Sequence, residues 1–196
     1  DAKCVANKSD AIWSAERFTV SSSRKSIIQK NSNKSVEYPY PNLIGTHQIS
    51  NAMTAISTLT HLKVPRKHIC EGLKSTYWPA RLQEINKGSL YDLIKSYNIK
   101  NQLWIDGGHN EDASIQLRKN MGFINKKDLH IIFGSLKNKD HTSFLRNLAT
   151  VASSLSIVQI ENQPSSLLKT EAASSAKEAG WKKIYLSHGI RDAIKY

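Results

Sequence analysis

Leu103-Trp104-Ile105-Asp106-Gly107-Gly108-His109-Asn110 is the stretch of sequence that decides the fold. Its first three residues are apolar and suit a buried strand, and an aspartate stands where that strand would end. Two glycines then allow a sharp turn, and Glu111 and Asp112 suit the first turn of a helix. A strand, a turn and a helix in this order are typical of α/β sheets, in which ligands bind beyond the carboxyl ends of the strands.

The turn at Asp106 has two interpretations. In the first, Asp106 accepts hydrogen bonds from a sugar hydroxyl while His109 and nearby backbone N–H groups face phosphate. In the second, Asp106 only caps the turn and His109 is solvated, because Asp-Gly is a common turn dipeptide. The stretch by itself leaves both interpretations open.

Strand and helix patterns alternate along the second half of the chain. They predict strands at 103–106, 129–134, 155–160 and 183–186, with helices at 111–121, 142–151 and 168–179 and one more from residue 190. Strands that alternate with helices form βαβ crossovers. We therefore expect an α/β fold with a Rossmann-like, mainly parallel sheet.

The first forty residues have weaker patterns. Residues 11–13 and 18–20 are candidates for short strands, and residues 21–34 are rich in Ser, Lys and Asn, which predicts a loop or a strained edge. Residues 38–41 alternate Tyr with Pro, which favours an extended connection.

A helix with two different faces is predicted between residues 43 and 62. Its apolar face comprises Ile49, Ala52, Met53, Ile56 and Leu59. Its polar face comprises His47, Asn51, Thr54 and Thr58. This polar face either meets a ligand or faces solvent.

A second helix is predicted from Pro65 to about Lys74, followed by the stiff pair Trp78-Pro79. Arg81 comes two residues later, so its guanidinium would be well positioned for phosphate. A surface ion pair is the alternative for Arg81. After Gln83 the pattern changes, with a hairpin turn expected at 86–88 and an irregular insert near 96–98, so we place a domain boundary after residue 84.

Composition and charge exclude several classes of protein. No apolar run approaches the length of a membrane span, and the first residues show no charged-then-apolar signal pattern. Cys4 and Cys70 lack metal-site spacing, so we expect a cytoplasmic protein with free thiols. The net charge of +12 is spread evenly, with 12 Lys/Arg and 6 Asp/Glu in residues 1–85 and 16 and 10 in residues 86–196. Such an even distribution argues against a nucleic-acid-binding protein and is compatible with the binding of small anionic substrates.

Four motifs together resemble one family. They are Leu43-x-Gly45-x-His47-Gln48-x-x-Asn51-Ala52, Trp78-Pro79-x-Arg81-Leu82-Gln83, Asp106-Gly107-x-His109-Asn110, and Phe133-Gly134-Ser135-Leu136 with Lys139-Asp140-His141. Their order is similar to that of folylpolyglutamate synthases, including the bifunctional dihydrofolate synthases, within the Mur ligase superfamily. The resemblance covers about residues 36–196.

The resemblance implies ATP-dependent amide formation. ATP would phosphorylate a folate or dihydropteroate carboxylate, and the amine of L-glutamate would displace phosphate from the acyl phosphate. It implies ATP contacts for Asn51 near adenine, Arg81 near the phosphates and Asp106 near the ribose, with His109 facing the reacting end as the candidate catalytic residue. It also implies Mg²⁺, whose ligands we expect upstream of this chain.

The resemblance divides the chain into residues 1–84, the end of a central ATP-binding domain, and residues 85–196, a truncated C-terminal α/β domain. Two departures are visible: Ala80 replaces the usual glycine before Arg81, and residues 84–102 look longer than the usual connection. If residue 80 needs positive φ, alanine there costs on the order of 1 kcal/mol.

The sequence lacks the phosphate-binding pattern GxxxxGK followed by Ser or Thr, since none of its nine glycines precedes a lysine. We therefore expect a fragment that lacks its N-terminal half and is inactive alone. The alternatives are a non-catalytic remnant that binds nucleotide or a partner chain, and a fragment of a peptidoglycan Mur ligase.

Overall fold

The described residues form three small β-sheets with helices packed beside them. The computed structural model describes residues 18–21, 25–31, 34–97, 99, 102–122 and 124–195. The chain divides into two compact units between Pro79 and Ala80. This division lies slightly before the boundary expected after residue 84, and the domain assignment itself stays a prediction.

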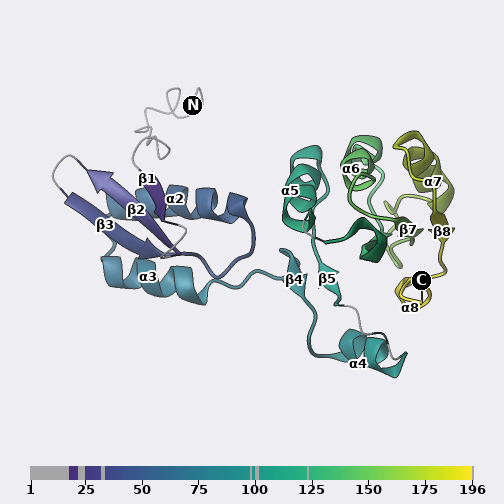
Figure 1. Cartoon of the computed structure of the whole chain (residues 1–196), viewed down its shortest axis with the longest axis horizontal. Coiled ribbons are helices and arrows are strands. Elements are labelled where there is room, and N and C mark those ends of the chain that lie inside the picture. Colours follow the sequence, from purple (N-terminus) through teal and green to yellow (C-terminus); the bar gives the residue numbers. More distant parts are fainter. Residues whose placement is uncertain are drawn as a thin grey trace. The chain divides into compact units, whose positions relative to one another are not determined.

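The first unit is an antiparallel sheet with two helices. Its elements are β1 (Phe18–Ser21), β2 (Ser26–Asn31), β3 (Lys34–Pro39), α2 (Thr46–His61) and α3 (Arg66–Ser75). The strands pair in the order β1-β2-β3, with Ile27 opposite Tyr38. Figure 1 shows α2 and α3 beside this sheet.

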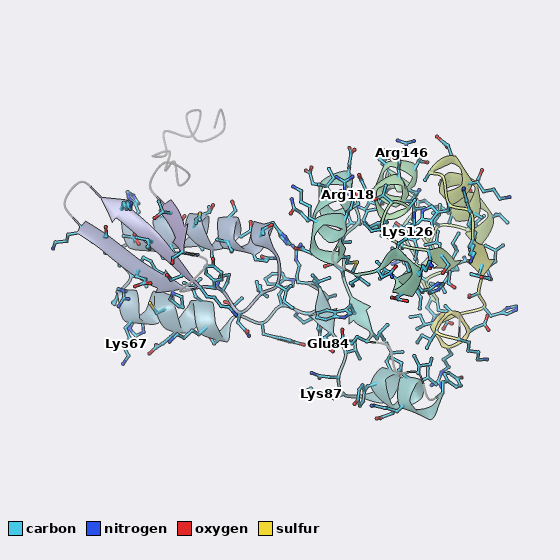
Figure 2. All side chains as sticks on the ribbon, viewed as in Figure 1. Lys67, Glu84, Lys87, Arg118, Lys126 and Arg146 are labelled. Atoms are coloured by element: carbon cyan, nitrogen blue, oxygen red, sulfur yellow. The ribbon has the colours of Figure 1, made fainter. Side chains whose placement is uncertain are left out.

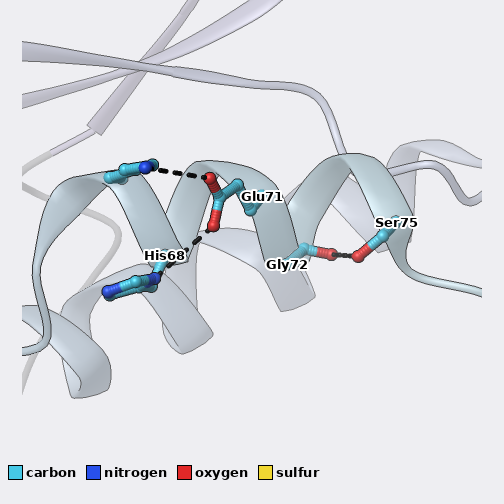
Figure 3. Close-up of polar contacts among 5 residues, drawn as sticks. His68, Glu71, Gly72 and Ser75 are labelled. Atoms are coloured by element: carbon cyan, nitrogen blue, oxygen red, sulfur yellow. Dashed lines mark hydrogen bonds and ion pairs between the residues drawn. The ribbon is translucent and has the colours of Figure 1, made fainter.

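The core of the first unit confirms the apolar face of α2. Its buried members are Ile27, Tyr38, Ala52, Ile56, Ile69 and Leu73. Ile49, Met53 and Leu59 pack against them, partly buried. The other predicted helix, α3, carries exposed charged side chains (Figure 3). Lys67 Nζ lies 4.0 Å from Glu71 Oε1, and His68 Nδ1 lies 3.4 Å from Glu71 Oε2. Exposed pairs of this kind contribute little stability.

Two expectations for the first forty residues have different outcomes, and one falls outside the described residues. The strand at 18–20 is confirmed as β1. The loop or strained edge expected at 21–34 is wrong, because β2 occupies its centre as the middle strand and buries Ile27 completely between β1 and β3. Burial against neighbours decided this strand over its polar composition. The strand expected at 11–13 lies outside the described residues.

The second unit begins with a two-stranded antiparallel pair and continues as a parallel α/β layer. Its elements are β4 (Gln83–Glu84), α4 (Ser89–Ser96), β5 (Trp104–Ile105), α5 (Glu111–Met121), the 3-10 turn η2 (Lys126–Asp128), β6 (His130–Phe133), α6 (His141–Leu148), β7 (Ser154–Ile157), α7 (Lys169–Glu178), β8 (Ile184–Leu186) and α8 (Ile190–Ala193). β6, β7 and β8 pair in parallel in that order. The expected α/β fold with a parallel sheet is thus confirmed.

A continuous core lies between the parallel sheet and its helices. Figure 1 shows α5, α6 and α7 in a row along one side of these strands. Leu145, Leu155 and Ala176 are completely buried there, and Trp181 donates from Nε1 to the Leu145 carbonyl at 3.0 Å. None of the described helices has the length and apolar character that crossing a membrane requires.

Two expectations at the start of the second unit are corrected. The strand containing Trp104 was expected to begin the parallel sheet, but β5 pairs antiparallel with β4, Gln83 opposite Ile105. The returning segment 80–84 occupies that edge through additional hydrogen bonds to residues 106 and 107. The hairpin turn expected at 86–88 is also wrong, because α4 begins directly after Gly88 and buries Ile94. The irregular insert expected near 96–98 falls at the end of α4 and partly outside the described residues, so it stays a prediction.

One titratable side chain lies across the parallel sheet. His130 Nδ1 is 2.7 Å from Ser154 Oγ, and its Nε2 is 2.9 Å from Ser156 Oγ. Leu155 points into the helix-covered core, so Ser154 and Ser156 lie on the opposite face of β7. Desolvation by burial lowers the pKa of His130 below its usual value of 6.5.

We predict that His130 makes the folded state less stable in acid. Because its pKa is lower in the folded chain, its contribution is complete above about pH 6.5 and declines as the pH falls toward the folded pKa. The variant His130→Gln should therefore lose less free energy of unfolding than the wild type between about pH 8 and pH 5, measured by urea denaturation. Equal losses in the two proteins would contradict this role.

Candidate functional site

The carboxylate of Asp106 organises the turn after β5. Its Oδ2 accepts from the Leu82 backbone N–H at 2.7 Å, and its Oδ1 accepts from the Gly108 backbone N–H at 2.7 Å. The side chain is half-buried. It therefore does cap the turn, as one of the two sequence interpretations required. Since a carboxylate oxygen has two acceptor positions, each oxygen can still accept one further hydrogen bond.

Arg81 lies between two residues with unusual backbone conformations. Ala80 has φ of 55° and Leu82 has φ of 44°, both in the left-handed region that non-glycine residues rarely adopt. The Gly107 N–H donates to the Ala80 carbonyl at 2.8 Å, and the Ala80 N–H donates to Gln83 Oε1 at 3.0 Å. These contacts bring Arg81 and Asp106 together in one loop cluster.

The side chain of Arg81 is exposed above this cluster. Strained backbone conformations of about 1–3 kcal/mol each persist where the surrounding structure enforces them, and they concentrate at functional sites. Residue 80 does have a positive φ, so alanine at this position carries the conformational cost considered above. The observation therefore favours a functional presentation of the guanidinium over an incidental surface position.

His109 lies in the same turn and is exposed. Its Nδ1 is 3.0 Å from the Gly107 carbonyl, to which it donates. In the neutral ring this leaves Nε2 as the acceptor. Asn110 caps α5 by accepting from the Ala113 N–H at 2.9 Å, while Glu111 and Asp112 place negative charge in the first helical turn.

Asn51 lies in the first unit, on α2, and is exposed. Its Nδ2 donates to Gln48 Oε1 at 3.1 Å, and Gln48 Nε2 lies 2.9 Å from His47 Nε2. Thr54 and Thr58, which share the polar face, donate back to helix carbonyls. Gln48 is buried and orients Asn51, a role that its position beside His47 in the first motif could have indicated.

The fourth motif forms the loop after β6. Asp140 caps α6 by accepting from the Ser143 N–H at 3.0 Å. Hydrogen bonding from the Ser143 side chain, and next from its backbone N–H, holds the pKa of the Asp140 carboxyl below its usual value. His141 Nε2 lies 2.8 Å from the Leu136 carbonyl and closes the loop. A Cβ on Gly134 would lie 3.2 Å from the Val158 carbonyl, so glycine permits close packing against the end of β7.

Basic side chains on the outer helices have a local explanation. Arg118 and Arg146 lie in the last turns of α5 and α6, and Lys126 donates to the Ala149 carbonyl at the end of α6 at 2.8 Å (Figure 2). Cations at helix C-termini complement the helix dipole. Within the part of the chain that the structure describes, no three His, Cys, Asp or Glu side chains gather to bind a metal ion.

Comparison with known proteins identifies the relatives. The chain is 27% identical over 98% of its length to the dihydrofolate synthase/folylpolyglutamate synthase of Bacillus subtilis. It is 28% identical over 57% of its length to a probable bifunctional folylpolyglutamate synthase/dihydropteroate synthase of Haloferax volcanii. The relatives of this chain are folylpolyglutamate and dihydrofolate synthases. No protein-family model matches the sequence.

Solved structures of folylpolyglutamate synthases share the fold of this chain. Folylpolyglutamate synthase of Mycobacterium tuberculosis, complexed with ADP and AMPPCP, covers 99% of the chain with a TM-score of 0.74 and 19% identity. A bifunctional enzyme with Mn, AMPPNP and L-glutamate bound covers 91% with a TM-score of 0.69 and 18% identity. The chain spans 41% of the length of the B. subtilis relative, 12% of the H. volcanii relative, and 43% and 38% of these two structures.

We predict that Gly108 is required and Gly107 is not. A Cβ at residue 108 would lie 2.8 Å from Asp106 Oδ1 and 2.9 Å from Ala113 Cβ, so the turn must shift. Gly108→Ala should reduce the free energy of unfolding by about 1–3 kcal/mol. Gly107→Ala is the matched control, because its Cβ would meet only the Ala80 carbonyl at an ordinary 3.5 Å. Equal losses in the two variants, measured by urea denaturation, would contradict the assignment.

We predict that Ala80→Gly stabilises the chain. Glycine relieves the strain at φ of 55° but adds freedom to the unfolded chain, so we expect a gain of up to about 1 kcal/mol. Ala149→Gly is the control, because Ala149 has φ of −59° and should lose about 0.5–1 kcal/mol. A loss of stability in both variants, on urea denaturation, would show that residue 80 is not strained.

Proposed function

We propose that this chain carries part of the nucleotide and substrate sites of an ATP-dependent amide ligase of the folylpolyglutamate synthase type. The observation that carries the proposal is the exposed Arg81, flanked by two left-handed residues and joined to the Asp106 turn. The relatives of this chain are ATP-dependent ligases, and one related enzyme has been crystallised with an ATP analogue and L-glutamate. The substrates would be ATP, a folate or dihydropteroate, and L-glutamate.

Asp106 is proposed to bind the ribose. Its orientation is set by two backbone N–H groups, so its remaining acceptor positions have defined directions. A ribose diol offers two O–H donors at matching range, and a hydrogen bond to a carboxylate is about twice as strong as a neutral one. The structural and the ligand-binding interpretations of Asp106 are therefore compatible.

Arg81 is proposed to bind the phosphates. The first turn of α5 carries Glu111 and Asp112, which oppose an anion at that helix end. Phosphate recognition in this cluster therefore falls on the guanidinium of Arg81, which offers five N–H donors in a planar fork.

His109 is proposed to act at the reacting end. When the amine of glutamate attacks an acyl phosphate, a C–N bond forms, the C–O bond to phosphate breaks, and the amine loses a proton. A neutral His109 Nε2 is an acceptor suited to that proton, because Nδ1 donates to the Gly107 carbonyl. This assigns His109 the role of general base.

Asn51 is proposed to recognise adenine. A carboxamide offers a donor and an acceptor side by side, which matches the N6 and N7 edge of adenine. The hydrogen bond to Gln48 fixes the amide orientation. The division into two domains, residues 1–84 and 85–196, is part of this proposal. The described residues offer no ligand set for Mg²⁺, so no step is assigned to a metal bound by this chain.

A nucleotide titration tests the proposal. Arg81→Lys keeps the charge but loses the fork, so ATP binding should weaken about tenfold in calorimetry. The matched control Arg118→Lys changes a residue at the end of α5 and should bind as the wild type does. The wild type should also prefer ATP to 2′-deoxy-ATP. Equal affinity of the wild type and the Arg81 variant for ATP would overturn the proposal.

A further inference from the structure

The turn after β5 contains an Asp-Gly pair, Asp106-Gly107, and no other aspartate or asparagine of the sequence precedes a glycine. In such a pair the backbone nitrogen of the glycine can attack the side-chain carboxyl carbon of the aspartate, because glycine has no Cβ to hinder the approach. The product is a succinimide ring. This reaction needs no enzyme, so the structure around the pair decides how fast it proceeds.

Both reacting groups are occupied by hydrogen bonds while the turn is closed. The nucleophile, the Gly107 N–H, donates to the Ala80 carbonyl at 2.8 Å. The electrophile, the Asp106 carboxyl group, accepts from the Leu82 and Gly108 N–H groups, each at 2.7 Å. Ring closure breaks the bond to Ala80 and one bond to the carboxyl group, since one carboxyl oxygen leaves as water. The closed turn therefore protects the pair.

The segment that holds the turn closed is strained. Ala80 and Leu82 have φ of 55° and 44°, in the region that residues with a Cβ rarely adopt. When their bonds to Gly107 and Asp106 break, the backbone of this segment can relax, which offsets part of the cost of opening. The side chain of Leu82 stays buried in the core, so this opening is local and leaves the unit folded.

The pair lies where water can reach it. Gly107 is exposed and Asp106 is half-buried. A Cβ built on Gly107 would meet the Ala80 carbonyl at an ordinary 3.5 Å, so the glycine is not packed under a side chain. Water can therefore leave and enter during the reaction without unfolding of the chain.

We propose that Asp106-Gly107 is a self-modification site at which the folded chain slowly forms isoaspartate. The Gly107 nitrogen bonds to the carboxyl carbon of protonated Asp106, and the amide hydrogen and the carboxyl OH leave as water. A second water then cleaves the bond between the Gly107 nitrogen and the main-chain carbonyl carbon of Asp106. The main chain now runs through the former side chain, and the former main-chain carbonyl is a free carboxylate.

This modification changes the geometry of the loop cluster. The main chain gains one carbon in the turn, and the new carboxylate is attached directly to Cα, so the two hydrogen bonds from Leu82 and Gly108 cannot both be kept. If Asp106 binds ribose as proposed above, the modified chain loses that contact. The modification chemistry itself does not rest on the proposed function.

Peptide mapping of the full chain after prolonged warm incubation at mildly acidic pH tests this site. Isoaspartate at residue 106 is measured by mass spectrometry and by resistance to an endoproteinase that cleaves before aspartate. The native chain should form it, but more slowly than the same chain unfolded in guanidinium chloride, because the reaction must wait for the turn to open. Asp140, which precedes histidine and caps α6, is the internal reference and should form far less.

Three variants separate the chemistry from the structure. Gly107→Ala hinders the attacking nitrogen, so isoaspartate should nearly disappear in both the native and the unfolded chain. Ala80→Gly relieves strain and should slow the native reaction by up to about fivefold, without changing the unfolded rate. Gln83→Leu removes the acceptor of the Ala80 N–H and should speed the native reaction about fivefold. The control Ala149→Gly, at the end of α6, should react as the wild type does.

Three results would overturn the site. The native chain forms no isoaspartate at residue 106, or it reacts as fast as the unfolded chain, or Ala80→Gly and Gln83→Leu both react at the wild-type rate. None of these measurements involves a nucleotide. The modification site and the proposed nucleotide site can therefore fail independently.

Discussion

The two hydrogen bonds accepted by the Asp106 carboxylate are the constraint on which the candidate site depends. One comes from Leu82, twenty-four residues earlier, and the other from Gly108 in the same turn. Together they fix the segment before β4 against the turn after β5. A buried backbone N–H left without a partner costs about 1–3 kcal/mol, so this carboxylate stabilises two segments at once. Gly108 is needed because any side chain there would displace the carboxylate.

Elements with complete local signals were predictable from the sequence. Helix α5 runs from Glu111 to Met121 as expected, because Asn110 caps it and acidic residues open it. The parallel strands β6 to β8 were found because each is a short apolar run between helical patterns. Strand β2, helix α4 and the β4–β5 pair were missed, since their partners lie far along the chain or, for α4, because the apolar spacing of Leu90, Leu93 and Ile94 was overlooked.

The candidate site shows the same limit. Arg81, Asp106 and His109 carry side chains whose chemistry is visible in a motif, and the structure brings them into one loop cluster. Leu82 contributes through its backbone N–H, and a backbone contact cannot be predicted from the type of side chain. A hollow lined by residues 159–164, Lys169 and His188 could also not be predicted from the sequence. Its lining comes from two loops and the start of one helix, which only the parallel sheet brings close together.

Strain at Ala80 and Leu82 connects stability to function. Two left-handed residues cost on the order of 2–4 kcal/mol together. Three hydrogen bonds oppose this cost at about 1 kcal/mol each: Gly107 to Ala80, Ala80 to Gln83 and Leu82 to Asp106. The balance is near zero, so the turn gains the chain no clear stability. The turn does expose the Arg81 guanidinium on a fixed loop, in the same cluster as the Asp106 carboxylate, which has free acceptor positions. That arrangement fits the proposed ligand, because a nucleotide is an anion that also bears hydroxyl groups.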